Sequence, residues 1–170
     1  ASSYKWILGP HGLGIVHLTN PAAFPADAAG WRSVEDVFAP DRLEAVHFRH
    51  DARRLELGFP SFLGAYVLSE SLSMLLASDR DEAEAYVMAL TSRLVDGLLA
   101  LGAQLLSPLE PAHRSTNISV VAHEGEAVAA RMLESGVRVW GGDGRVRFSV
   151  HAFNSVEDID AALEAYRAAT

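Results

Sequence analysis

Residues 2–14 read SSYKWILGPHGLG, in which Lys5 stands directly before the apolar run 6–8 and a glycine-rich turn follows. Burying an ammonium group is costly and favours the neutral amine. The neutral amine is the form of lysine that attacks an aldehyde to make an imine. The stretch therefore predicts either a reactive lysine in an apolar niche or a lysine at a strand end whose amine reaches water.

The composition is that of a folded protein with a sizeable core: 170 residues, 49% hydrophobic, 21% charged, with a formal net charge of −8. No dense run of Lys and Arg occurs, so we expect a small-molecule partner and no nucleic acid. The apolar runs are shorter than the roughly 20 residues of a membrane-spanning helix, so we expect no membrane partner and a cytoplasmic location. The absence of cysteine excludes disulfides and a cysteine nucleophile within this chain.

Residues 1–45 are expected to form the end of an α/β domain. The apolar stretches 6–8 and 13–18 flank the turn at residues 9–12 and resemble two strands joined by that turn. Residues 19–40 are rich in Pro, Ala, Gly and Asp without a sustained period, which predicts a long loop.

Residues 46–170 are expected to form a small α+β domain with an antiparallel sheet and covering helices. Pro60 and Ser61 predict the start of one helix, and Ser78 or Asp79 predicts the start of a longer one that ends at Gly102. The pattern then predicts a strand at 116–122, a helix at 125–135, a strand at 137–140, a hairpin turn at 141–144 and a strand at 145–150. Ser155 begins a capping-box pattern that predicts a terminal helix.

The stretch around Lys5 resembles the cofactor-lysine region of the class V aminotransferase group of fold type I pyridoxal-phosphate enzymes. The resemblance implies that Lys5 carries pyridoxal 5′-phosphate as a Schiff base. It also places Ser2 and Tyr4 where relatives have phosphate-binding groups, whereas His11, in the adjacent turn, would either contact substrate or face solvent. We therefore expect an enzyme that acts on an amino acid or amine, of the aminotransferase, epimerase or C–S lyase type.

A second stretch, GRVRFSVHAFNSVEDID at residues 144–160, is similar to the Arg-x-Ser strand near the C-terminus of that group. The resemblance implies that Arg147 binds the α-carboxylate of an amino-acid substrate, a role that suits the planar guanidinium. The alternative is a surface arginine paired with Glu157 or Asp158. We expect Arg145 to point to the opposite face of the strand and to be solvated.

A third stretch, ELGFPS at residues 56–61, is similar to the group's Glu-x-Gly-Thr-Pro-Asn segment. In relatives, the threonine contacts the cofactor phosphate of the neighbouring subunit, and the sites lie between subunits, which implies a homodimer. Here Phe59 replaces the threonine and Ser61 replaces the asparagine. The contact is therefore lost, moved to Ser61 or replaced by ring packing.

Residues next to these motifs indicate the reaction subtype. Tyr4 occupies the place where persulfide-forming relatives have a histidine, and no cysteine precedes the Arg147 strand. The resemblance thus favours an isopenicillin epimerase-like or C–S lyase-like branch over a cysteine desulfurase. No metal is expected, because His47 and His50 lack a third ligand at motif spacing.

The chain begins directly on the Lys5 motif, so we expect a C-terminal fragment of the enzyme. The alternative is a non-catalytic C-terminal module that lacks the upstream half of the cofactor site.

Overall fold

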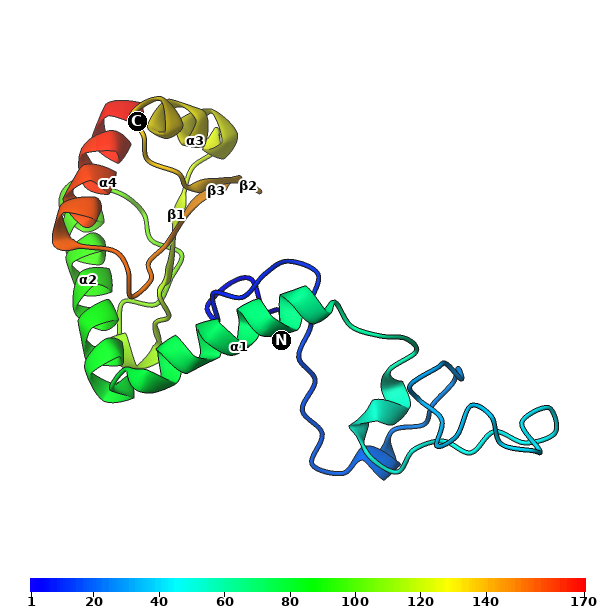
Figure 1. Ribbon diagram of the computed structural model, residues 1–170. Coiled ribbons are helices and arrows are strands. Elements are labelled where there is room, and N and C mark those ends of the chain that lie inside the picture. Colours follow the sequence, from blue (N-terminus) through cyan, green and yellow to red (C-terminus); the bar gives the residue numbers. More distant parts are fainter. The chain divides into compact units, whose positions relative to one another are not determined.

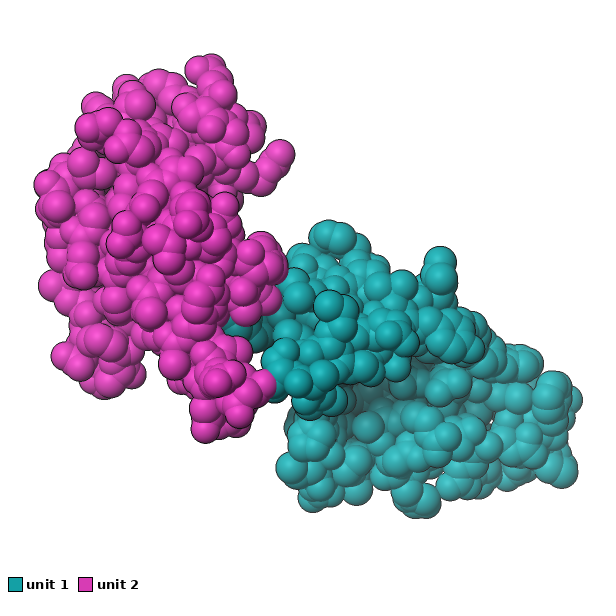
Figure 2. Space-filling model, turned by 60° about the vertical axis from the view of Figure 1, so that its left-hand side comes forward, with its two compact units in different colours: residues 1–78 teal, residues 79–170 magenta.

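The computed structural model describes residues 1–170, and Figure 1 shows its helices and strands. The chain divides into two compact units, Ala1–Ser78 and Asp79–Thr170, which are coloured separately in Figure 2. The units meet in the sequence at Ser78. The domain boundary expected at residue 45 stays a prediction.

The first unit is largely irregular. It contains the 3-10 helices η1 (Pro21–Ala23) and η2 (Ala52–Leu55) and one α-helix, α1 (Phe62–Ala77). The Ser61 hydroxyl accepts a hydrogen bond from the Gly64 N–H at 3.2 Å, which confirms the predicted helix start. The strands predicted at 6–8 and 13–18 are wrong, because Leu8 has a left-handed backbone (φ 58°) and only one bridge forms, between Ser2 and Gly14.

The second unit holds the regular structure. Its helices are α2 (Arg80–Ala100), α3 (Gly125–Glu134) and α4 (Val156–Ala169), with the 3-10 helix η3 (Pro111–His113). Strands β1 (Asn117–Val121), β2 (Trp140–Gly142) and β3 (Arg145–Ser149) form an antiparallel sheet in the order β1-β3-β2. This arrangement of a small antiparallel sheet with helices confirms the predicted fold class of the second part.

Side chains cap the longer helices of this unit as the sequence predicts. The Asp79 carboxylate accepts hydrogen bonds from two backbone N–H groups of the first turn of α2, each at 2.9 Å. Gly102, with φ 78°, follows the end of that helix. Ser155 and Asp158 form a reciprocal capping box at the start of α4.

Strand β2 begins later than predicted. The strand expected at 137–140 starts only at Trp140 and includes both Gly141 and Gly142, so the turn is confined to Asp143 and Gly144. A Cβ atom on Gly141 would lie 2.0 Å from the Gly125 carbonyl oxygen. Glycine is required there because the strand backbone passes directly against the start of α3.

The core of the second unit lies between one face of the sheet and the helices. Helix α4 packs against α2 and α3. The buried side chains include Leu90, Leu94, Leu98, Ile118, Val120, Met132, Val146, Phe148, Ile159 and Tyr166. None of the helices combines the length and the apolar character that crossing a membrane requires.

Truncating Leu98 to alanine should destabilise the second unit by about 2–5 kcal/mol, because this side chain is fully buried and its loss leaves a cavity. The neighbouring Leu99 is 44% exposed and provides the matched control. Urea unfolding of Leu98→Ala and Leu99→Ala measures both effects. Equal losses of stability in the two variants would contradict the described core.

Candidate functional site

Residues 2–14, here called the Lys5 loop, are folded by their own backbone hydrogen bonds. The Leu8 N–H donates to the Lys5 carbonyl at 3.0 Å, which closes a turn with Lys5 at its start. The Gly9 N–H donates to the Ser3 carbonyl at 2.8 Å. The loop therefore has a defined shape although it contains no regular strand.

A buried serine ties the two arms of this loop together. Ser3 is completely buried, and its Oγ lies 2.6 Å from the Pro10 carbonyl oxygen and 3.0 Å from the Leu13 carbonyl oxygen. A buried carbonyl left without a donor is costly, so this hydroxyl stabilises the return of the chain towards Ser2. The motif indicated Ser2 and Tyr4 but not Ser3, because no local pattern marks a serine whose partners are carbonyls seven and ten residues away.

Helix α1 supports the Lys5 loop within the first unit. The Ser71 hydroxyl donates to the Leu8 carbonyl at 2.9 Å. A Cβ atom on Gly64 would lie 3.1 Å from Leu13 Cδ1 and 3.2 Å from Ser61 Oγ. The small residue at position 64 thus lets the loop lie close to the start of the helix, and it brings Ser61 near the Leu13 end of the loop.

Lys5 itself is exposed, and its amine makes no hydrogen bond or ion pair; its Nζ lies 5.9 Å from the centroid of the Tyr4 ring. The prediction that an apolar niche surrounds this amine is therefore wrong: no residues of this chain bury it. The physical reason is that Trp6 and Leu8 are themselves 47% and 41% exposed, so the run after Lys5 does not bury it.

Four predicted site residues belong to the Lys5 loop: Ser2, Tyr4, Lys5 and His11. The rings of Tyr4 and His11 stack, with centroids 4.2 Å apart and planes inclined by 20°. Tyr4 and the Lys5 amine are neighbours in the sequence and in space. Ser2 is exposed at the base of the loop, where its backbone pairs with Gly14. The hydroxyls of Ser2 and Tyr4 both remain free to donate hydrogen bonds.

Phe59 lies among rings and a cation. Its ring centroid is 6.1 Å from that of Phe62 and 5.6 Å from the guanidinium carbon of Arg32. Both neighbours belong to the same chain, so the fate of the contact with the neighbouring subunit stays a prediction. Ser61 accepts a bond from the helix backbone, and its own proton stays available.

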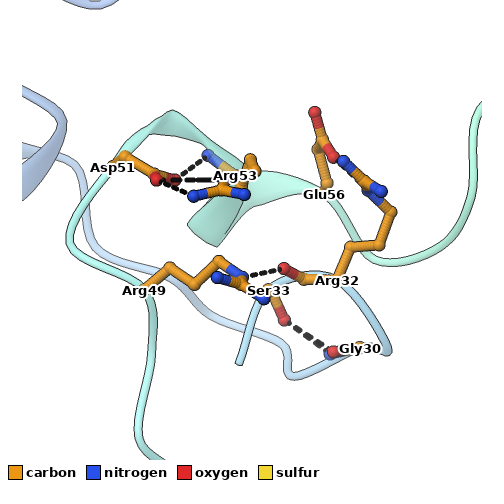
Figure 3. Close-up of polar contacts among 7 residues, drawn as sticks. All are labelled: Gly30, Arg32, Ser33, Arg49, Asp51, Arg53 and Glu56. Carbon is orange, nitrogen blue, oxygen red and sulfur yellow. Dashed lines mark hydrogen bonds and ion pairs between the residues drawn. The ribbon is translucent and has the colours of Figure 1, made fainter. Parts of the chain in front are cut away.

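The segment between residues 30 and 56 is held by polar contacts, which Figure 3 shows. Ser33 is buried, and its hydroxyl accepts a hydrogen bond from the Gly30 N–H at 2.7 Å. The Arg49 Nε–H donates to the Arg32 carbonyl at 2.9 Å, and Arg32 pairs with Glu56 at 2.6 Å. These contacts replace the regular structure that this stretch lacks.

Two more charges in this segment are already neutralised. The guanidinium of Arg53 binds the Asp51 carboxylate and lowers the pKa of Asp51 to about 2. A cavity of about 250 Å³ is bordered by Arg32, Arg49 and Phe59. Among its arginines, Arg32 and Arg53 are paired with carboxylates, whereas Arg49 donates to a backbone carbonyl.

His47 and His50 have separate acidic partners and do not converge. The His47 Nε2 lies 2.7 Å from an Asp41 carboxylate oxygen, whereas the His50 Nε2 lies 3.5 Å from a Glu35 oxygen. The hydrogen bond to Asp41 raises the pKa of His47 above its ordinary value of 6.5, and the same bond lowers the pKa of Asp41.

In the second unit, Arg147 lies on the outer face of β3. Val146 and Phe148 point into the core, so Arg145, Arg147 and Ser149 point away from it. The expectation that Arg145 points to the opposite face from Arg147 is wrong, because residues two apart on a strand share a face. Both guanidinium carbons lie over the Trp140 ring, at 5.3 and 5.2 Å from its centroid.

Arg147 has no carboxylate partner. The alternative pairing with Glu157 or Asp158 is not formed, since Asp158 accepts hydrogen bonds from Ser155 and Asn154 at the start of α4. The cavity of about 330 Å³ beside α4, lined by residues such as Arg138 and Ile159, does not include Arg147. Arg147 is therefore a half-buried guanidinium on an open sheet face, free to bind an anion.

Replacing Ser3 by alanine should loosen the Lys5 loop. Loss of a hydrogen bond worth about 1–1.5 kcal/mol predicts roughly tenfold faster amide hydrogen exchange at Gly9 and Ile15. Ser2→Ala removes a similar but exposed hydroxyl and should leave these rates unchanged. Unaltered exchange in Ser3→Ala would show that the buried hydroxyl does not hold the loop.

The pKa of His47 should fall towards 6.5 when Asp41 is replaced by asparagine. A raised folded-state pKa means that the pair stabilises the fold below about pH 6.5 and that this contribution is lost as the pH rises through the folded-state pKa. NMR titration of the His47 ring protons measures the shift. Asp27→Asn removes the same charge elsewhere, and a His47 pKa equal in both variants would refute the pairing.

Solved structures with the same fold are enzymes at low sequence identity. The apo cysteine desulfurase from Thermococcus onnurineus NA1 gives a TM-score of 0.85 at 22% identity, over 98% of this chain and 45% of that chain. The cystine C-S lyase C-DES, in complex with cysteine persulfide, gives a TM-score of 0.82 at 18% identity, over 98% of this chain and 45% of that chain. The cysteine desulfurase CsdA from Escherichia coli gives a TM-score of 0.69 at 20% identity, over 84% of this chain and 38% of that chain.

These similarities establish the fold, and the chain spans less than half the length of those proteins. No curated protein matches the sequence. Residues 1–162 match the family described as aminotransferase class-V, which covers both the Lys5 loop and the Arg147 strand. This match over nearly the whole length shows that the chain belongs to the class V aminotransferase family.

Proposed function

We propose that this chain supplies the cofactor lysine and the carboxylate-binding arginine of a pyridoxal-phosphate-dependent enzyme that acts on an amino acid. The observation that carries the proposal is that Lys5 is the only lysine in the sequence, and that its amine is free of partners on a loop held by Ser3. The family to which the chain belongs supports an enzyme of the transferase or lyase kind.

The cofactor is pyridoxal 5′-phosphate, which the family supports and which is named for two similar structures, a C-DES mutant and a protein called SPT. When bound, this group supplies an aldehyde for attachment and a ring that takes up electrons from the substrate. The residues of the Lys5 loop fit it, since the exposed amine of Lys5 can condense with an aldehyde and the hydroxyls of Ser2 and Tyr4 can donate to a phosphate.

We assign three further tasks to residues of this chain. The Lys5 amine moves the proton at the Cα atom of the substrate as a general base. The Arg147 guanidinium, which has no carboxylate partner in the structure, binds the α-carboxylate through two parallel hydrogen bonds. His11, whose ring stacks on Tyr4, contacts the substrate.

For the subtype, we propose a transaminase, epimerase or C–S lyase that does not carry a persulfide on this chain. The support is chemical: the chain has no cysteine, and the turn between β2 and β3 contains Asp143 and Gly144. The isopenicillin epimerase-like branch stays a prediction that rests on Tyr4.

We propose a homodimer on the strength of the family resemblance, with Ser61 as the residue that can still donate to a phosphate of the neighbouring subunit. Phe59 cannot donate such a bond, and its ring lies beside Arg32 and Phe62. The Ser61 hydroxyl proton is not used by the helix cap, because the cap needs only the oxygen.

A second candidate function is a non-catalytic module. The exposure of Lys5 favours this alternative, because no apolar niche within the chain lowers the cost of a neutral amine. In that case the 170 residues would not bind the cofactor selectively.

Incubation with pyridoxal 5′-phosphate, reduction with borohydride and peptide mass spectrometry test the two candidates. The enzyme predicts one pyridoxyl group per chain on Lys5, since reduction makes the link permanent. Lys5→Arg keeps the charge but not the nucleophile and should abolish the adduct. The α-amino group is the other amine available, so labelling there in place of Lys5, or no labelling, would support the module.

A further inference from the structure

The outer face of β3 carries two cations beside one aromatic ring. Arg145 and Arg147 are separated by one residue and project from the same side of the sheet, opposite the buried Val146. Their registered partners on β2 are Gly142 and Trp140. The Trp140 side chain lies over Gly142 of its own strand: a Cβ atom on Gly142 would be 3.0 Å from the Trp140 Cζ2 atom.

Neither cation is neutralised by a buried carboxylate. Arg147 forms no ion pair, and Arg145 lies 3.6 Å from Asp143, whose side chain is 77% exposed. Such an exposed pair contributes little, so the charge of Arg145 remains available. The Nε atoms of both arginines are buried without a hydrogen-bond partner, whereas their guanidinium groups contact the indole ring.

The Trp140 ring holds both guanidinium groups in defined positions. Cations bind to the face of an indole, and the planar guanidinium stacks on it particularly well. Arginine side chains held in this way lose less conformational freedom when they bind an anion. The remaining side chains of this face on β1 and β3 are small or polar, namely Asn117, Ser119, Val121 and Ser149.

We propose that Arg145 and Arg147 together bind a ligand with two separated carboxylates. This deepens the proposed function and rests on it: Arg147 takes the α-carboxylate, and Arg145 selects an amino acid whose side chain carries a second acidic group. The Cα atoms of residues two apart on a strand are roughly 6.7 Å apart, and the guanidinium carbons of Arg145 and Arg147 lie 5.3 and 5.2 Å from the centroid of the same indole ring. Both cations are therefore within reach of one short dicarboxylate, with one carboxylate on each guanidinium.

Binding of simple carboxylates to the 170-residue chain tests this without the cofactor. The probes are glutarate, which has two carboxylates, pentanoate, which has one on a chain of equal length, and inorganic phosphate. NMR at constant ionic strength follows the Trp140 indole N–H and the arginine Nε–H signals. We expect glutarate to bind at least about tenfold more tightly than pentanoate, and phosphate to bind more weakly than glutarate.

Two variants test whether the preference for glutarate depends on Arg145. Arg145→Gln should remove the preference for glutarate and leave pentanoate binding unchanged, whereas Arg80→Gln removes the same charge from an exposed site on α2 and should keep the preference. Dispersed amide spectra of both variants show that they are folded. Equal affinities for glutarate and pentanoate in the unaltered chain would overturn the proposal, as would phosphate binding as tightly as glutarate, or loss of the preference in Arg80→Gln.

The outcome is separable from that of the Lys5 labelling. A chain that prefers glutarate but takes no pyridoxyl group on Lys5 refutes the enzyme and keeps a two-anion site. A chain that is labelled on Lys5 but shows no preference refutes only the assignment of Arg145.

Discussion

The hydrogen bonds of the buried Ser3 hydroxyl are the constraint on which the candidate site depends. They join Ser3 to the carbonyls of Pro10 and Leu13, and so they close the loop that carries Lys5. The loop is then fixed to α1 through the Leu8 carbonyl and Ser71. An exposed lysine would otherwise sit on a freely moving segment, where positioning a reactive amine would cost conformational entropy. The buried serine lets the amine be both accessible and placed.

In the second unit, the alternation of buried and outward-facing residues along β3 determines where Arg147 lies. Val146 and Phe148 are fixed in the core, which forces the intervening arginine outward together with its neighbour two residues before. The strand cannot slip by one residue without burying two guanidinium groups. Core packing therefore determines which side of the sheet presents Arg147, and the close approach of Gly141 to Gly125 fixes the strand that carries Trp140.

Local signals in the sequence predicted the helices well, because capping is a local interaction. Ser61, Asp79 and Ser155 each accept bonds from N–H groups two or three residues later, and the helices begin where these residues indicate. The Lys5 loop could not be predicted in the same way. Its apolar residues resemble strands, but a ladder needs partners from elsewhere in the chain, and only the pairing of Ser2 with Gly14 forms. The close approach of Gly141 to Gly125 is likewise a contact between residues far apart in the sequence. The candidate site residues came from motif resemblance, whereas Ser3 and Trp140 act through contacts that no spacing reveals.

We propose that Lys5 forms the covalent link to the cofactor. Because it is the only lysine, a chain prepared with ¹⁵N-labelled lysine has a single side-chain Nζ signal. Addition of pyridoxal 5′-phosphate should move that signal to the position of a nitrogen doubly bonded to carbon, with saturation at one equivalent. A signal that keeps its position while the cofactor is present in excess would contradict the account.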